Sequence, residues 1–358
     1  MPVRSANSRA GAVAVLLALI ACNDAANGAK TEASSAERVA AALDVCGEDA
    51  GAFAQNVCGN RALAQLDNQV REALVAESAS VSDAGAQLLV QNQNRWREAA
   101  RVSCRIVDPD AAPTPEQQRC LENEFRARAR DAQNTVQEIG GYTFQRMELV
   151  DAAPISAEIA ANMGGADIDP IERDIRFPRI DGPQTPEIRR FNDLVAQQPQ
   201  YALADAVNEN VDYRIGFAGP ELISVRFDSR YDGPTLANVA KTIRVITVLM
   251  TDGRPLTEAD VFRADSGWRD FISARALAEI QRQLPDYPPP PRRDVYETAT
   301  KPHLWLITER NLVLIFPPQS MTGWTYADPA EGVEVAIPWT ELRAYLNPAA
   351  PAPIRPPV

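Results

Sequence analysis

The side chains of this sequence that could carry redox, nucleophilic or metal chemistry are five cysteines and one histidine, His303. A single histidine excludes mechanisms that need two, the His-rich zinc sites among them. The cysteines show no Cys-x-x-Cys spacing and none lies near His303, so a structural zinc site is excluded as well. His303 lies in an alternating stretch, which predicts a structural or surface histidine in a strand over 303–308.

Carboxylates are too numerous for a catalytic pair to be singled out. The chain has 48 acidic and 36 basic residues and a net charge of −12. This balance argues against a nucleic-acid partner, which needs a basic face. A glycosidase with an acid–base pair of carboxylates stays open as an alternative. The sequence favours a protein that is not an enzyme and that holds no cofactor or metal.

The start of the sequence has the composition of an export signal. Arg4 and Arg9 precede a small and apolar run over 10–21, which as a helix would be about 18 Å long against roughly 30 Å of hydrocarbon. This length is typical of a signal peptide, here predicted over 1–21. The closing residues Leu19-Ile20-Ala21-Cys22 resemble the lipobox of bacterial lipoproteins. That resemblance implies cleavage before Cys22, diacylation of its thiol and acylation of the new amine.

The alternative is an ordinary secreted protein cut after Ala25 or Ala26. A chain lipidated at Cys22 would be held on the periplasmic face of a bacterial cell membrane, because several acyl chains on one residue anchor a protein stably. Residues 22–38 are small and polar. We expect them to form a structureless tether between the bilayer and the first folded part.

The remaining cysteines, Cys46, Cys58, Cys104 and Cys120, lie in the first third of the chain. An even number of cysteines in an exported protein predicts disulfides. Three pairings are possible, and proximity in the sequence favours Cys46–Cys58 and Cys104–Cys120. Each closure would restrict the unfolded chain by about 3 kcal/mol.

Helical periodicity surrounds these cysteines. Apolar residues recur at spacings of three and four over 63–74, and further helices are predicted over 86–105 and 115–139. Prolines punctuate the loop before the third helix. We expect residues 39–140 to form an all-α helical bundle stapled by two disulfides.

Several polar and aromatic positions in this region have a distinctive spacing. Cys58 precedes Asp67 by nine residues, and Gln93, Trp96 and Cys104 follow in order. These residues resemble the LprI-type family of lysozyme-inhibitor lipoproteins. The sequence departs from the family at residues 100–101, which are Ala-Arg where the family has Arg-Asp. Trp96 is expected to be a core anchor between helices, and Gln93 a buried amide that bonds to backbone.

Beyond residue 141 the pattern predicts an α+β domain over 141–347, followed by a Pro-rich tail over 348–358. Alternation and β-branched runs predict strands, and longer apolar periodicities predict helices. The expected strands are 142–150, 211–218, 221–231, 242–250, 303–308, 312–316 and 333–338, and the expected helices are 257–262, 268–284 and 339–346.

Two segments of this second part resemble a known family. One is 177–182, Phe-Pro-Arg-Ile-Asp-Gly, followed by Asn192; the other is 311–318, followed by Gly and Ile-Pro within 332–338. They resemble the extracytoplasmic domain of the anti-sigma factor RsiV and relatives attached to peptidoglycan deacetylases. The family often carries Gly-Gly-Ala-His after a middle strand, whereas this sequence has no histidine there.

Both resemblances imply envelope proteins that meet muramidases. Lysozymes are strongly basic, so an acidic chain would steer their encounter. We therefore expect a non-catalytic inhibitor or sensor of a lysozyme-like muramidase. A general envelope lipoprotein that binds peptidoglycan or a protein partner is the alternative. For the binding loop the sequence suggests 228–235, with Tyr231 as aromatic anchor and Asp228 and Asp232 facing a basic rim; a plain hairpin turn is the other interpretation.

Overall fold

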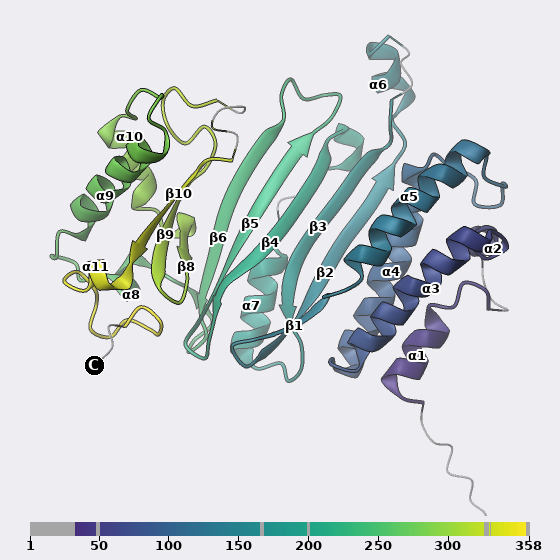
Figure 1. Ribbon diagram of the computed structural model, residues 1–358, viewed down its shortest axis with the longest axis horizontal. Helices are drawn as coiled ribbons and strands as arrows, with labels where there is room; N and C mark the ends of the chain where they lie inside the picture. The colour runs from purple at the N-terminus through teal and green to yellow at the C-terminus, as the bar shows by residue number, and fades with distance from the viewer. Residues whose placement is uncertain are drawn as a thin grey trace, which may run out of the picture. The chain divides into compact units, whose positions relative to one another are not determined.

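The computed structural model describes residues 33–47, 51–164, 168–198, 201–325, 329 and 331–355. The predicted leader, the lipidation site Cys22 and the tether up to residue 32 lie outside these described residues. Within the described part of the chain, no helix is both long enough and apolar enough to span a membrane. Contacts group residues 34–358 into one compact unit, with helices in its first part and mixed sheet in the remainder (Figure 1).

The described residues of the first part form five helices, four of which begin at a residue whose side chain caps them. Side-chain oxygens of Ser34, Asn60, Ser82 and Thr114 accept hydrogen bonds from amides of the following turns, as expected of N-cap residues. The helices are α1 (Ser35–Ala42), α2 (Ala52–Gly59), α3 (Arg61–Ser78), α4 (Asp83–Ser103) and α5 (Pro115–Asp131).

Helix α1 shows that the predicted tether ends too late. Ser34 and Glu37 form a capping box, and Val39 and Leu43 are buried against apolar residues of α3 and α4. The small, polar composition of the segment concealed this helix. A capping box followed by two apolar residues four positions apart is the signal that was overlooked.

The disulfides Cys46–Cys58 and Cys104–Cys120 are both present, with sequence separations of 12 and 16. The favoured pairing is therefore confirmed. Cys46–Cys58 ties the end of the α1 segment to α2, and Cys104–Cys120 ties the end of α4 to α5. Both lie around a core that contains Trp96, Leu121 and Phe125.

The third predicted helix was extended too far. Helix α5 ends at Asp131, Asn134 adopts a φ of 63°, and residues Val136–Ile139 form strand β1. A positive φ at Asn breaks the helical run. Gly140 and Gly141, both at positive φ, make the two-residue turn to β2 (Tyr142–Ala153), as in a type I′ hairpin. The predicted domain boundary falls in this turn.

The main sheet has seven strands in the order of the chain, β1 to β7. Neighbouring strands are antiparallel except β3 and β4, which are parallel. The remaining bounds are β3 (Ile171–Ile180), β4 (Asn208–Ala218), β5 (Leu222–Asp232), β6 (Ala240–Leu249) and β7 (Arg254–Pro255). Helix α6 (Ala157–Asn162) lies between β2 and β3 in the sequence. Helix α7 (Pro186–Ala196) forms the crossover from β3 to β4 and packs Phe191 and Val195 into the sheet core.

The last part builds a second sheet of three strands, in the order β10-β9-β8. Its core packs Phe262 on Trp268 at 4.4 Å between ring centroids, with Trp305 edge-on to both. The bounds are β8 (Trp305–Ile307), β9 (Asn311–Phe316), β10 (Val333–Pro338), α8 (Glu258–Val261), α9 (Trp268–Gln283), α10 (Arg292–Ala299) and α11 (Trp339–Leu342).

One prediction for this region, the strand at His303, is corrected, and the Pro-rich tail has a feature that the sequence did not predict. His303 is exposed and lies in a short 3-10 turn, Pro302–Leu304, before the strand begins, because Pro302 fixes a turn conformation. The Pro-rich tail is packed: Ala350 and Ile354 are fully buried, and the guanidinium of Arg355 pairs with Glu221 at 3.0 Å.

Candidate functional site

The structure corrects the location given to the predicted binding loop. Strand β5 runs to Asp232 and pairs Tyr231 with Ala240 of β6, so most of 228–235 belongs to a strand. Tyr231 is 6% exposed, and its ring packs edge-on against Tyr201 at 5.3 Å. Because the Tyr231 ring is buried, it does not project from the surface as the predicted aromatic anchor would. The alternation of β5 continues past the residues that were assigned to a turn.

The two acidic residues of that segment are engaged along the strand. Asp228 accepts hydrogen bonds from Arg226, and Asp232 from Arg230 and Asn208. Residues two apart share one face of a strand, which explains both Arg–Asp pairs. Burial acts to raise the pKa of Asp232, but the bonds from Asn208 and Arg230 outweigh it and the pKa is lowered. A ligand-binding role for Asp228, Tyr231 and Asp232 stays a prediction.

A groove lies elsewhere, lined by residues of α4, α5, β2 and β3; Figure 1 shows the arrangement of these four elements. It consists of two adjoining cavities of about 160 Å³ and 450 Å³, which share Ala99, Val150, Asp151 and Arg173 in their walls. Both helices and both strands contribute charged side chains. A concave site with convergent polar groups is the usual setting for ligand binding.

Trp96 and Arg128 form the inner wall of the smaller cavity. The Trp96 ring packs edge-on against Phe125 at 4.9 Å, and the Arg128 guanidinium lies 5.4 Å from its centroid. Trp96 is therefore the core anchor that the sequence predicted. Gln93 is buried as expected, but its Oε1 accepts from Arg128 Nε at 2.8 Å rather than from backbone.

Arg128 continues into a buried ion-pair cluster with β2. Its Nη1 lies 2.8 Å from Glu148 Oε2, and Arg146 Nε lies 2.8 Å from Glu148 Oε1. Arg128 is 4% exposed and Glu148 is 1% exposed. Burial acts to raise the pKa of Glu148, but the charges of Arg128, Arg146 and Arg176 outweigh it and hold the pKa below its usual value. Glu148 is thus ionised at neutral pH.

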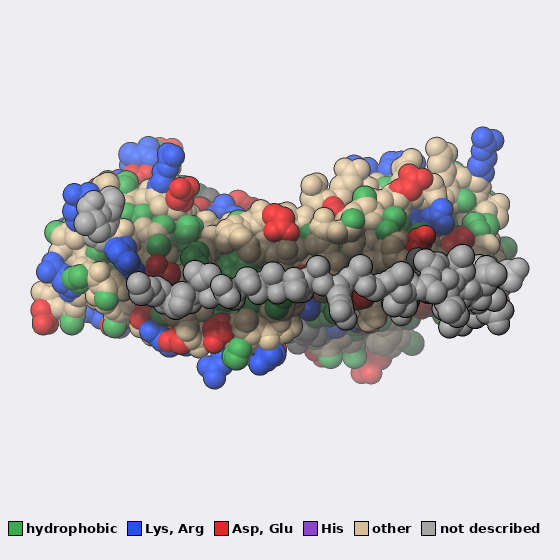
Figure 2. All heavy atoms as spheres, turned by 90° about the horizontal axis from the view of Figure 1, so that it is seen from below, with side chains coloured by type: hydrophobic (Ala, Val, Ile, Leu, Met, Phe, Trp, Pro, Cys, Tyr) green, Lys and Arg blue, Asp and Glu red, His purple; other side chains and the backbone are tan. Residues whose placement is uncertain are grey.

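Apart from Arg95, which donates to the backbone oxygen of Glu148, the arginines along the groove are neutralised by ion pairs within the protein. Arg173 pairs with Glu209 at 2.9 Å, and Arg176 pairs with both Asp131 and Asp174. These pairs, like Arg128–Glu148, leave few cations facing the cavity. On the face shown in Figure 2, side chains of Lys and Arg also lie among those of Asp and Glu rather than in a single patch.

Three carboxylates in the groove form no ion pair with a described side chain: Asp151 of β2, which lines both cavities, and Glu124 and Glu172. Glu124 of α5 and Glu172 of β3 line the smaller cavity. Burial, and next the charge of Glu172, raise the pKa of Glu124. The groove therefore presents negative charge that a cationic ligand could neutralise. Among the described residues, no group of three or more His, Cys, Asp or Glu is arranged to hold a metal ion.

Comparison with known proteins gives two similar solved structures. One is a DUF3298 family protein from Bacteroides fragilis, with 11% identity, a TM-score of 0.37, and coverage of 59% of this chain and 96% of the other. The second is a DUF3298 family protein from Pseudomonas aeruginosa PAO1, with 13% identity, a TM-score of 0.41, and coverage of 61% and 98%. No protein family and no curated protein matches the sequence. At these scores the similarity carries no inference about this chain.

Proposed function

We propose that this protein is a non-catalytic binding protein of the bacterial cell envelope. It is anchored through Cys22, and its ligand is a basic muramidase of lysozyme type. In this proposal the helical part and the mixed α/β part are two domains of one binder. Two disulfides support a location outside the reducing cytoplasm, and the net charge of −12 favours a basic ligand.

The observation that carries this proposal is the pair Glu124 and Glu172 in the groove. Arg128, Arg173 and Arg176 of the groove are paired internally, so they repel an incoming cation less than Arg95 does, which forms no ion pair with a described residue. A lysine or arginine side chain of the ligand is long enough to enter while its apolar stem packs against the wall. There it would form charge-assisted hydrogen bonds with both carboxylates.

Replacing Glu124 and Glu172 together by Gln is expected to weaken binding of lysozyme by about tenfold or more, because a charge-assisted bond contributes roughly 1.5–3 kcal/mol. The measurement is a calorimetric titration of the whole protein with lysozyme at low salt. Glu122→Gln is the matched control, since Glu122 lies on the same helix but does not line the groove. Equal weakening by the control variant would contradict the assignment.

The same site predicts how the affinity for lysozyme changes with pH. The pKa of Glu124 is raised, so on acidification this carboxyl takes up a proton before exposed glutamates do. A cation binds the ionised form, and the affinity for lysozyme should fall as the pH falls through that raised pKa. The test is to measure the affinity for lysozyme as the pH is lowered from about 7 over the range in which the protein stays folded, with Glu124→Gln expected to flatten the profile. A profile that is equally steep in the variant would assign the titration to another group.

If lysozyme fails to bind at micromolar concentration in low salt, the muramidase part of the proposal is wrong. The alternative then is a general envelope lipoprotein that binds peptidoglycan or a protein partner. The acidic groove would remain a cation site whose ligand must be sought among other basic proteins of the envelope.

A further inference from the structure

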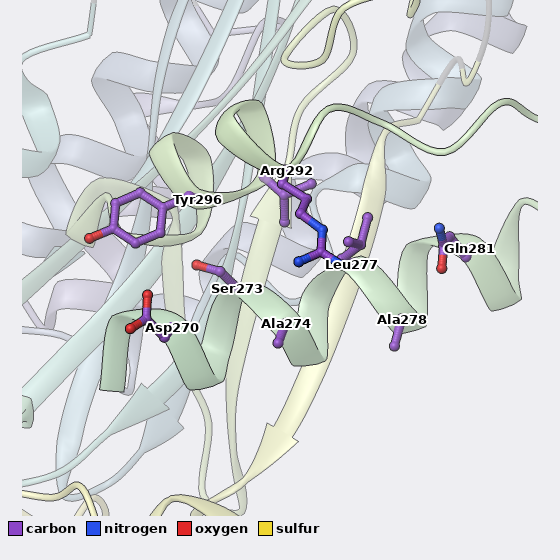
Figure 3. A pocket seen from close by; sticks show the side chains of 9 residues that line it. Asp270, Ser273, Ala274, Leu277, Ala278, Gln281, Arg292 and Tyr296 are labelled. Atoms are coloured by element: carbon purple, nitrogen blue, oxygen red, sulfur yellow. The ribbon is translucent and has the colours of Figure 1, made fainter. Parts of the chain in front are cut away.

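A second groove lies between α9 and α10, in a part of the chain that the first groove does not touch. It has a volume of about 460 Å³. Figure 3 shows the α9 residues of its wall spaced along the helix, with side chains of α10 opposite them. The lining residues are Asp270, Ser273, Ala274, Leu277, Ala278, Gln281, Arg292, Val295 and Tyr296.

The middle of this groove is lined by apolar residues, two of which have small side chains. Ala274 and Ala278 are one helical turn apart on α9, with Leu277 beside them and Val295 buried on α10. These apolar side chains form a wall against which small apolar side chains of a ligand can pack. Tyr296 is 39% exposed, so part of its ring is open to a ligand in the groove.

One acidic and one basic residue of the groove, unlike the charged residues near them, form no ion pair with a described residue. On these helices Arg269, Arg275, Arg282 and Arg293 each form an ion pair with a glutamate. Arg292 forms none with any described residue, and neither does Asp270. The two do not pair with each other either. Both side chains are exposed to solvent, so within the described part of the chain the groove offers a ligand one unpaired cation on α10 and one unpaired anion on α9, with no internal ion pair to break.

The separation of these charges sets the length of a ligand. Figure 3 shows the Arg292 side chain extending toward Leu277, and Tyr296 near Asp270 and Ser273. From Asp270 to Leu277 is seven residues, or about 10 Å along a helix. Three residues of extended peptide span about the same distance. A ligand with an amine at one end and a carboxylate at the other would therefore satisfy both charges.

We propose that the α9–α10 groove binds a short peptide of about three small residues with both ends free. Its carboxylate pairs with Arg292, whose guanidinium favours bidentate contact. Its ammonium group pairs with Asp270 and lies against the Tyr296 ring, as cations do over aromatic faces. The small side chains pack on Ala274, Leu277 and Ala278. This site is independent of the acidic groove and of the muramidase proposal.

The test is titration of the whole protein with trialanine and with two blocked derivatives, N-acetyl-trialanine and trialanine amide. Each blocked form lacks one charge, so each is expected to bind about two- to fivefold more weakly than the free peptide, the range of an ion pair between exposed groups. Dialanine, which is too short to span the two charges, should also bind more weakly. Equal binding of all four compounds, or no binding of trialanine, would overturn the proposal.

Variants assign each end of the peptide to its residue. Arg292→Gln should abolish the preference for the free carboxylate over the amide, while the preference for the free amine remains. Asp270→Asn should do the reverse. Arg293→Gln is the matched control, because Arg293 is its neighbour but pairs with Glu297 outside the groove. Unchanged preferences in both variants, or tight binding of an N-acetylglucosamine tetramer that competes with trialanine, would show that the groove takes another ligand.

Discussion

Glu148→Gln is expected to lower the free energy of unfolding by about 3–5 kcal/mol, because it leaves Arg128 as an uncompensated charge in the interior. Arg128 and Glu148 are almost fully buried and 2.8 Å apart. The amide keeps the size of the carboxylate but not its charge. Urea unfolding at pH 7 measures the change. Glu309→Gln, at an exposed residue, makes the same chemical change and should stay within about 0.5 kcal/mol of the parent.

A double variant separates the lone buried charge from simple loss of packing. Adding Arg128→Met to Glu148→Gln removes both charges and should recover a large part of the lost stability, since a buried ion pair is often replaceable by apolar groups. A double variant at least as unstable as the sum of the single ones would show that the charges themselves hold the helices to the sheet.

The pH dependence of this variant has a definite sign. The folded pKa of Glu148 lies below its usual value, so its contribution is present above the unfolded pKa, about 4.3. That contribution is lost as the pH falls through the folded pKa. The difference in stability between parent and Glu148→Gln should therefore shrink on acidification below about pH 4. A difference that is constant with pH would mean that Glu148 is not ionised in the folded protein.

The cluster also connects the two parts of the molecule. Arg95 Nη1 donates to the backbone oxygen of Glu148, and Asn92 Nδ2 donates to that of Arg146. Ser82 of α4 donates to Asp181 after β3. Because these bonds cross between the helices and the sheet, destabilising Glu148 should shift unfolding transitions of both parts together.

Local patterns in the sequence were sufficient to predict most of the helices and strands. Five strands have alternating apolar and polar residues or are rich in β-branched residues. Their predicted bounds agree with the structure to within three residues; they are β4, β5, β6, β9 and β10. Helices α4 and α9 carry the expected apolar stripe, and helix α5 begins at Pro115 after its Thr114 cap. Such elements are determined by neighbours in the sequence.

Strand β3 was not predicted, and the reason is its charge. Its ten residues include Arg173, Asp174, Arg176 and Arg179, a composition typical of an exposed segment. These charges are tolerated because partners far away in the sequence neutralise them, as Glu209 of β4 does for Arg173. No local pattern carries that information.

The candidate site was missed for the same reason. Glu124 and Arg128 come from a helix and Glu172 from a strand, and only the fold brings them together in one groove. The spacing of Gln93 and Trp96 indicated buried positions but not their partners. One signal was available: Arg146 and Glu148 share a face of a predicted strand with Phe144, and charges in register with a core aromatic residue indicate a buried ion pair.

Loss of the Cys104–Cys120 disulfide is expected to lower the free energy of unfolding by about 2–5 kcal/mol, chiefly by freeing the unfolded chain. The bond joins the end of α4 to α5, the two helices that supply Trp96, Glu124 and Arg128 to the groove. Their relative position also fixes the distance of Glu124 from β3. The double variant Cys104→Ala, Cys120→Ala should therefore lose both stability and affinity for lysozyme.

The double variant Cys46→Ala, Cys58→Ala is the matched control, because that disulfide closes a loop of similar size away from the groove. It should lower the stability to a similar degree, measured by urea unfolding, and leave lysozyme affinity within about twofold under conditions where both variants are folded. Thiol titration of the unfolded parent without reductant should find none of these four cysteines reactive. Four reactive thiols would refute the disulfides, and equal loss of affinity in both variants would separate the groove from the geometry of α4 and α5.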